Sequence, residues 1–431
     1  MRSLSVCVAI VLLCVAGQAP AQKDKGKEPE YRGKALSAWA AELKNPDAKK
    51  RAEAAEMIGR LRERALPAVG ALVAALSDTD AGVRVKVTEA IKDIGPGAAE
   101  AIPALITLTG AREKKVRQEA ALALGYLSAR TGGKAVPVLV ALLEDKDKDV
   151  RQSAALAIGI IGNKATGTTP ALTKALTDTE SMVRERAAYT LGQLGPEAKE
   201  AVPALATATR DPDKSVRQSA AYALGQSKGD AAVTVPALVA LLKDPEERVQ
   251  MAGAMAISNV GPKAAAAIPD LMAALRDPSK YVRRDVTFAL SMIGQPALPT
   301  LIAALKDEAI RLDVMEAIGR IGYDAGDAVA PVMEFLKDKD PIVRGTAVVT
   351  LGRMGSTAKA AVPAMTELLK DKHDVVRAAA AGSFFLMGRE GKSAVPALIE
   401  AAKDKVPEVR KQALQSLQSL DPEAAKKVKD Q

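Results

Sequence analysis

The sequence predicts an all-α fold in which about twelve helical hairpins stack side by side as an α-solenoid superhelix. The main observation is a position that recurs along the chain and is almost always arginine. Its occupants are Arg51, Arg84, Arg117, Arg151, Arg184, Arg217, Gln250, Arg283, Arg311, Arg344, Arg377 and Arg410. The spacing is 33 residues, apart from one interval of 34 and one of 28. Such a period is typical of helical repeats.

The pattern inside one unit, residues 135–162, predicts the hairpin itself. Two apolar segments flank a short charged turn, and in the second segment Val150, Ala154 and Ile158 fall on one side at helical spacing. Gly162 follows where a helix is expected to stop. Each unit is therefore predicted to be a helix, a tight turn and a second helix.

Proline and glycine recur at the expected helix ends. Proline suits a first helical turn or a kink because it has no N–H to donate. It lies fourteen residues before the arginine position at Pro103, Pro137, Pro170, Pro203, Pro236, Pro269, Pro363 and Pro396. Glycine lies eleven residues after the arginine position at Gly95, Gly162, Gly195, Gly261, Gly294, Gly322, Gly355 and Gly388.

Aspartate recurs six residues before the arginine position, and stacking of the units should bring the two columns together. We expect a ladder of charge-assisted hydrogen bonds between neighbouring units, because arginine offers a planar fork that a carboxylate can accept. The predicted ladder comprises Arg84, Arg151, Arg184, Arg217, Arg283, Arg344, Arg377 and Arg410 with Asp78, Asp145, Asp178, Asp211, Asp277, Asp338, Asp371 and Asp404. Exposed ion pairs contribute only about 0–1 kcal/mol each, so the expected role is registry.

These motifs resemble the HEAT repeat. Proline is followed eight residues later by aspartate, and Val-Arg comes five and six residues after that, as in Pro137, Asp145 and Val150-Arg151. The units are similar to HEAT-like repeats of bacterial proteins, including those related to phycobilisome lyases, over residues 31–422. The resemblance implies a solenoid, but its motif residues are structural and do not identify a function.

The first residues differ in composition from the repeats. Met1 and Arg2 precede an apolar run at 6–16, and Ala19-Pro20-Ala21 then precedes charged residues. We interpret 1–21 as a signal peptide cleaved after Ala21, 22–30 as a flexible charged leader and 423–431 as a basic tail. The protein is therefore expected to be exported, periplasmic or extracellular, with no membrane span in the mature chain. An uncleaved anchor is the alternative.

Cysteine and histidine are too few for most metal and redox chemistry. Cys7 and Cys14 both lie in the predicted signal peptide, and His373 is the single histidine. Disulfides, a zinc centre and thiol chemistry are therefore not expected in the mature chain. Residues 225–229 match G-x-S-x-G by letter, but they close a second helix and lack a histidine base. We predict no enzyme, no cofactor and no metal.

Charge gives a weak indication of partners. The net charge is +9, from 61 basic and 52 acidic residues, without a basic block. The arginine column could contact phosphates, but pairing with the aspartate column is the favoured interpretation. Aromatic residues make up only 3% of the chain, too few for platforms that stack single-stranded bases. Nucleic acid is therefore disfavoured as a partner.

A stripe five residues after the arginine position is the candidate binding surface. Relative to the core of the second helix it points away, towards the expected inner surface of the array. Six successive units carry apolar or aromatic residues there: Leu122, Leu156, Tyr189, Tyr222, Met255 and Phe288. An apolar strip with a polar margin is typical of a partner-binding patch. The alternative is that these side chains only fill gaps between units.

The repeat pattern breaks beside this stripe. Gln250 replaces arginine, and the unit around Arg311 is five residues short. We predict a non-enzymatic, exported scaffold that binds a protein or peptide along the inner surface. A HEAT-like lyase or a nucleic-acid-binding HEAT protein are the alternatives implied by the resemblance.

Overall fold

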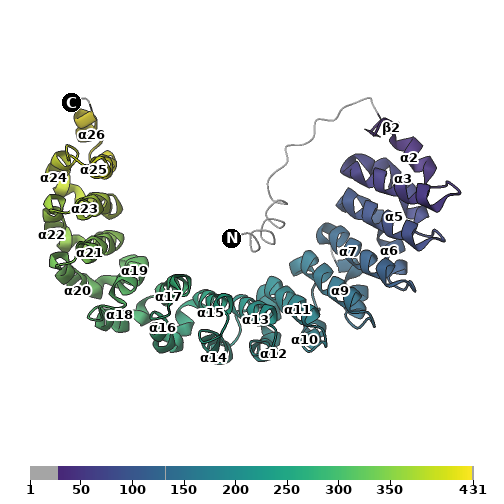
Figure 1. Cartoon of the computed structure of the whole chain (residues 1–431), viewed down its shortest axis with the longest axis horizontal. Helices are drawn as coiled ribbons and strands as arrows, with labels where there is room; N and C mark the ends of the chain where they lie inside the picture. The colour runs from purple at the N-terminus through teal and green to yellow at the C-terminus, as the bar shows by residue number, and fades with distance from the viewer. Residues whose placement is uncertain (1–27, 132, 430–431) are drawn as a thin grey trace. The chain divides into compact units, whose positions relative to one another are not determined.

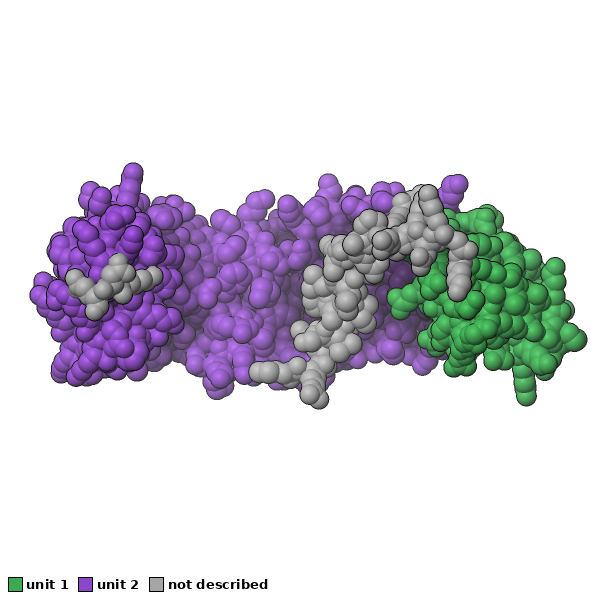
Figure 2. All heavy atoms as spheres, turned by 90° about the horizontal axis from the view of Figure 1, so that it is seen from above, with its two compact units in different colours: residues 1–108 green, residues 109–431 purple. Residues whose placement is uncertain are grey.

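The computed structural model describes residues 28–131 and 133–429. The chain forms two compact units, residues 1–108 and 109–431, which Figure 2 shows in separate colours. We call them unit 1 and unit 2. The predicted signal peptide lies outside the described residues, as does most of the predicted leader.

Unit 1 opens with a short antiparallel ladder, in which β1 (Glu30–Tyr31) pairs with β2 (Lys34–Ala35). The indole N–H of Trp39 donates to the carbonyl of Tyr31 over 3.1 Å, which ties the ladder to the first helix. The helices that follow are α2 (Leu36–Glu42), α3 (Ala48–Arg60), η1 (Arg62–Ala68), α4 (Val69–Ala75), α5 (Ala81–Ile94), η2 (Pro96–Ala101) and α6 (Ile102–Leu108).

Unit 2 consists of helical hairpins in two layers, as Figure 1 shows. The second helix of each hairpin packs against the second helices of its neighbours, as α11 does with α9 and α13. These second helices are α7 (Lys114–Thr131), α9 (Lys148–Ile161), α11 (Ser181–Leu194), α13 (Lys214–Gln226), α15 (Glu247–Val260), α17 (Lys280–Ile293), α19 (Arg311–Ile321), α21 (Pro341–Arg353), α23 (Asp374–Met387) and α25 (Pro407–Leu420).

The first helices of unit 2 are shorter and form the other layer. Most begin as a 3-10 turn that runs into one or two turns of α-helix. Their α-helical parts are α8 (Val136–Leu142), α10 (Thr169–Ala175), α12 (Val202–Ala208), α14 (Ala231–Leu241), α16 (Ile268–Ala274), α18 (Leu298–Ala304), α20 (Val329–Met333), α22 (Val362–Glu367) and α24 (Val395–Ala401). Helix α26 (Pro422–Lys429) follows the last hairpin and packs against α25.

Proline and glycine stand where the sequence predicts helix boundaries. Pro137 and Pro203 occupy the first turn of α8 and α12, where no N–H is needed. Pro236 differs, because α14 begins earlier at Ala231 and takes the proline into its interior. The recurrent glycines, from Gly95 to Gly388, all have positive φ, between 58° and 85°. This left-handed region favours glycine, which explains why the residue recurs at the helix ends.

Small residues let the second helices approach closely. The alanines Ala120, Ala154, Ala187, Ala220 and Ala380 are completely buried. Glycines eight residues after the arginine position form a second small-residue row. A Cβ added to Gly125 would lie 2.7 Å from the Cα of Ala157, and one added to Gly225 would lie 3.0 Å from that of Ala256. We call this row the glycine seam: Gly59, Gly125, Gly159, Gly192, Gly225, Gly319 and Gly352.

The unit that the sequence shows to be short has a different turn. Its second helix α19 begins at Arg311 itself, whereas α21 begins three residues before Arg344. The residue before α19, Ile310, offers no side-chain cap, whereas Asp340 caps α21 by accepting from the N–H of Ile342. Three of the five missing residues are lost before the first helix, because Gly294 and Pro299 are five positions apart whereas Gly261 and Pro269 are eight apart. The other two are lost from the turn and from the first turn of the second helix.

Within the described part of the chain, no single helix has the length and apolarity needed to cross a bilayer. One bent pair, Lys280–Ile293 with Gln295–Ala304, reaches that level by length and composition.

Candidate partner-binding surface

Arginine and aspartate meet between consecutive hairpins, and Arg217 illustrates the geometry. Its Nε donates to Asp244 Oδ2 over 2.7 Å and its Nη2 donates to Asp244 Oδ1 over 2.9 Å. Its Nη1 turns back to its own hairpin and donates to the carbonyls of Asp211 and Pro212, over 2.9 and 3.1 Å. One guanidinium thus joins two turns. We call each such arrangement a rung.

Seven rungs of this bidentate kind are present among the described residues. Each arginine meets the aspartate of the following hairpin, 27 or 28 residues further along the chain. They pair Arg51 with Asp78, Arg117 with Asp145, Arg151 with Asp178, Arg184 with Asp211, Arg217 with Asp244, Arg344 with Asp371 and Arg377 with Asp404. Arg51 and Arg117 were outside the predicted ladder.

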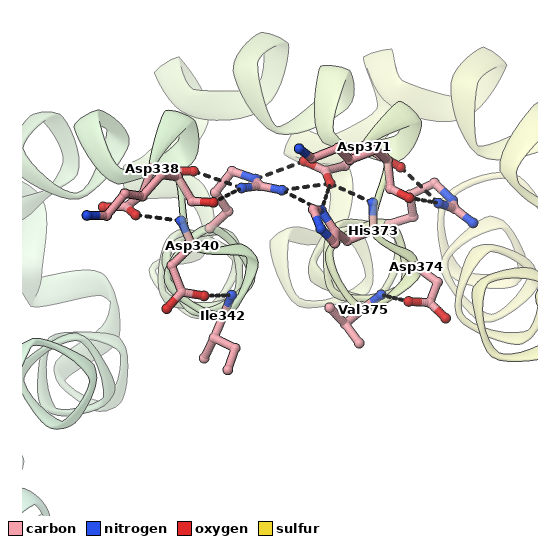
Figure 3. A network of polar contacts seen from close by, with 11 residues as sticks. Asp338, Asp340, Ile342, Asp371, His373, Asp374 and Val375 are labelled. Carbon is pink, nitrogen blue, oxygen red and sulfur yellow. Dashed lines mark hydrogen bonds and ion pairs between the residues drawn. The ribbon is translucent and has the colours of Figure 1, made fainter.

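The rung aspartates also shape the turn. Asp338 accepts from the backbone N–H of Asp340, and Asp371 accepts from that of His373, over 2.8 and 2.9 Å (Figure 3). The residue that donates each of these bonds directly precedes the second helix, so the aspartate closes the turn before the helix begins. In Figure 3 Asp340 caps the helix that follows, by accepting from the N–H of Ile342 over 2.8 Å.

Other members of the predicted ladder are placed differently. Arg283 lies 3.5 Å from Asp313, and Arg311 lies 4.0 Å from Asp338. Arg84 and Arg410 each donate through Nη1 to carbonyls of their own turns. Asp277 accepts from the N–H of Ser279, but no ion pair to it is present among the described residues. The irregular rungs thus include the three consecutive ones that begin at Gln250, Arg283 and Arg311.

Hydrogen bonding changes the acidity of the rung carboxylates. Burial of Asp371 by itself raises the pKa, but the hydrogen bonds from Arg344 and from the N–H of His373 outweigh burial and lower the pKa to about 2. The pKa of Asp404 is also lowered, mainly by the hydrogen bond from Arg377. These carboxylates are therefore held in the charged form.

The six predicted contact residues all lie on second helices of unit 2. Tyr222 and Met255 are exposed, at 37% and 41% of their full surface. The other four are partly buried. We call the six the apolar strip: Leu122, Leu156, Tyr189, Tyr222, Met255 and Phe288.

Two tyrosines at the centre of the strip form a stacked pair. The rings of Tyr189 and Tyr222 are 5.4 Å apart at an angle of 23°. The ring of Tyr222 also covers the backbone of Gly192, where an added Cβ would lie 2.5 Å from two ring carbons. Burial raises the pKa of Tyr222. These rings therefore pack between neighbouring hairpins and still present an edge to solvent.

Charged side chains lie at the margin of the strip. The guanidinium carbon of Arg186 is 5.8 Å from the ring centre of Tyr189, and that of Arg320 is 5.8 Å from that of Phe288. Arg320 also bonds Glu316 over 2.8 Å. Burial raises the pKa of Glu185, which lies one residue after the rung position on α11. The strip is thus an apolar surface with mixed charge at its edge.

Sequence reasoning missed a hollowed surface on the last hairpins of unit 2. Two clefts of about 650 and 490 Å³ lie on either side of Phe385, on α23, α25 and the neighbouring part of α21. Phe385 occupies the position of the glycine seam, where Gly319 and Gly352 stand in the preceding hairpins. An exposed aromatic side chain where the preceding hairpins carry glycine is the sequence signal that marks this surface.

The residues considered for chemistry have structural roles. The Oγ of Ser227, in the G-x-S-x-G match, is buried and donates to the carbonyl of Leu224 over 3.0 Å. The Nδ1 of His373 lies 3.0 Å from Nη2 of Arg344 and 3.3 Å from Asp371, beside a rung (Figure 3). No group of three or more potential metal ligands occurs in the part of the chain that the structure describes.

A family model described as HEAT repeats matches residues 36–125, 102–180, 169–258, 206–291, 235–312 and 298–384. A second model, described as HEAT repeat, matches residues 394–422. No curated protein matches the chain.

Solved structures resemble the chain at low sequence identity. Kap121p bound to Nup53p has a TM-score of 0.61 and 14% identity, with 92% of this chain and 50% of that chain covered. Kap121p bound to Pho4p has a TM-score of 0.59 at the same identity and coverage. A Kap95p complex with RanGDP has a TM-score of 0.57 and 15% identity, covering 94% of this chain and 64% of that chain. The chain spans about half the length of the Kap121p chains, and the likeness concerns the fold.

Proposed function

The chain belongs to the HEAT repeat family, and on this basis we propose that it is an exported, non-catalytic scaffold that binds a protein or peptide along the apolar strip. The observation that carries the proposal is the strip itself. Its residues come from six consecutive second helices, and Tyr222 and Met255 remain exposed at its centre. Partly exposed aromatic and methionine side chains with a charged margin are typical of protein interfaces.

Rigid aromatic groups are good anchors for a partner. The stacked tyrosines are held by each other and by the backbone of Gly192, so little conformational entropy would be lost on binding. Structures of similar fold were solved with a bound protein, as in Kap121p bound to Nup53p. This supports a solenoid of this architecture as a binding surface for another polypeptide.

Export rests on the sequence of the first residues. An apolar run at 6–16 followed by Ala19-Pro20-Ala21 is typical of a cleaved secretory signal. Mass spectrometry of the protein isolated from its native cell tests this directly. We expect the first residue to be Gln22, and recovery of the uncleaved chain from the membrane fraction would support the anchor instead.

Met255 provides the sharpest test of the strip. We expect Met255→Gln to weaken partner capture at least tenfold, because it places an amide in the middle of an apolar contact. Met182→Gln is the matched control, since Met182 is 58% exposed and lies outside the strip at the start of α11. Wild type and both variants are used as bait against the native envelope fraction, with recovery measured by quantitative mass spectrometry.

The result that supports the strip is a protein recovered by wild type and by Met182→Gln but lost with Met255→Gln. Its purified form should then bind the wild type directly, as measured by calorimetry. Equal recovery with all three baits would refute the strip as the binding surface. Equal thermal unfolding of the three proteins excludes loss of the fold as the cause.

A further inference from the structure

One rung of unit 2 has its acceptors in place but no guanidinium. At the position of the arginine stands Gln250, on α15, and the aspartate of the following hairpin is Asp277. Oδ1 of Asp277 accepts from the backbone N–H of Ser279 over 2.8 Å, as the aspartates of the filled rungs do from their own turns. The turn that receives the guanidinium is therefore formed.

The carbonyl acceptors of this rung follow from the register of the preceding one. In the preceding rung, Nη1 of Arg217 bonds the carbonyls of the residues six and five positions before it. The same register at Gln250 assigns this role to the carbonyls of Asp244 and Pro245. Among the described residues, no side chain donates to either carbonyl and no cation pairs with Asp277, which is partly exposed.

Glutamine cannot complete the rung by itself. A guanidinium carries five N–H donors in a rigid fork, whereas the amide of Gln250 has two on one nitrogen. Gln250 makes no side-chain hydrogen bond to Asp277 within the described ranges. Seven other rungs of the same chain show which group fits these acceptors, because each of them holds a guanidinium.

We propose that Asp277, with the carbonyls of Asp244 and Pro245, forms a binding site for a guanidinium group that the partner polypeptide supplies as an arginine side chain. The site selects the planar fork over an ammonium, because the carboxylate accepts two parallel bonds while the carbonyls take the third nitrogen. Gln250 lies on the same helix as Met255 of the apolar strip. The source of the arginine rests on the proposed function, whereas the site itself does not.

Methylguanidinium is the probe, with methylammonium at equal ionic strength as the control cation. Binding is followed in the full chain by backbone amide NMR of a deuterated sample, at concentrations well below those that denature. We expect saturable shifts at Ser279 and Glu246 with a dissociation constant on the order of 1–50 mM, as suits so small a ligand. Methylammonium is expected to give shifts at least tenfold smaller.

Three variants test the assignment of the site. Gln250→Arg should abolish the shifts because its own side chain fills the site, and Asp277→Asn should weaken binding at least tenfold. Arg217→Gln should create a second site, with saturable shifts at Asp213 that the wild type does not show. Binding by Arg217→Gln without binding by wild type would overturn the proposal, as would shifts that grow linearly or match those of methylammonium.

A separate experiment tests whether the partner polypeptide supplies the arginine side chain. Gln250→Arg should reduce capture of the partner at least tenfold while raising the unfolding temperature, since it completes a rung. Saturable methylguanidinium binding with unchanged capture by Gln250→Arg would overturn the assignment to the partner's arginine. Met255→Gln should still bind methylguanidinium, so a failure of the strip and a failure of the guanidinium site are distinguishable.

Discussion

Each filled rung depends on the shape of one side chain as much as on its charge. The fork of Arg217 bonds Asp244 with two nitrogens while its third nitrogen holds the carbonyls of the preceding turn. Both partners are largely buried, with 12% and 7% of their side chains exposed. A buried charge that loses its partner is costly, so these pairs matter more than ion pairs on an open surface.

Replacing the fork by a point charge should therefore destabilise the protein. We expect Arg217→Lys to lower the free energy of unfolding by about 1.5–3 kcal/mol, the range for hydrogen bonds to charged groups. Arg210→Lys is the matched control, since Arg210 is exposed in the same hairpin and should change stability by less than about 0.5 kcal/mol. Urea unfolding followed by circular dichroism measures both. Equal losses for the two variants would contradict a role of the fork.

The rungs also predict how stability depends on pH. The pKa of Asp371 is about 2 in the folded chain, below its usual value of 3.8. A carboxyl with a lowered folded pKa stabilises the fold above its unfolded pKa, and this contribution is lost as the pH falls towards the folded pKa. Stability should therefore decrease between about pH 4 and pH 2.

Asp371→Asn isolates the contribution of one rung. The variant should be less stable than wild type at pH 7, and the difference should shrink by on the order of 1–2 kcal/mol when the pH is lowered to about 2. Urea unfolding of both proteins at a series of pH values measures how their difference in stability changes with pH. A constant difference across the range would mean that Asp371 is not held ionised by Arg344 and the turn.

At the scale of helices, the glycine seam controls how closely neighbouring hairpins pack. Gly125 leaves room for the backbone of Ala157, because an added Cβ would lie 2.7 Å from its Cα. This distance is below any ordinary contact, and since it involves backbone, the helices would have to move apart. The hairpin of α23 carries Phe385 at this position instead of glycine, and its side chain is 44% exposed beside the two clefts.

A pair of glycine substitutions tests the seam. Gly125→Ala should destabilise the protein by about 1–3 kcal/mol, the usual cost of overpacking. Gly345→Ala is the control, because its added Cβ meets only the Cβ of Ala379 at 3.9 Å and alanine favours a helix. It should stabilise by about 0.5–1 kcal/mol. Thermal unfolding measures the change in stability of both variants. If Gly125→Ala stabilised the protein as Gly345→Ala does, helix propensity would outweigh packing at the seam.

At the scale of the array, adjacent rungs share a turn and should not act independently. Oδ1 and Oδ2 of Asp178 accept from Arg151, while the backbone carbonyl of Asp178 accepts from Arg184. A shift of this turn would therefore affect two rungs. Repeat arrays behave as chains of nearest-neighbour interactions, so the coupling should fade over a few units.

Double-mutant cycles test over how many hairpins the coupling between rungs extends. Arg151→Lys combined with Arg184→Lys should deviate from additivity by at least about 0.5 kcal/mol in the free energy of unfolding. Arg151→Lys combined with Arg377→Lys should be additive within about 0.3–0.5 kcal/mol, because the two rungs share no turn. Equal coupling for both pairs would argue against a nearest-neighbour chain.

Replacing both Tyr189 and Tyr222 by alanine would test binding less cleanly than replacing Met255 by glutamine. Tyr189 and Tyr222 stack on each other, and such aromatic pairs contribute about 0.5–1.5 kcal/mol beyond their burial. Alanine at both positions would therefore lower stability as well as remove exposed surface. Met255→Gln changes the surface while leaving this stack intact.

The sequence by itself determined the hairpins, because helix periodicity and the proline and glycine boundaries are properties of neighbouring residues. The recurrence of arginine and aspartate also predicted that the two columns meet. Only the tertiary structure decided the register: each arginine reaches the aspartate of the following hairpin, and Asp277 receives none. It also decided where helices touch, as at Gly125. The physical reason is that contacts between residues some thirty positions apart depend on how whole helices pack, which local spacing does not encode.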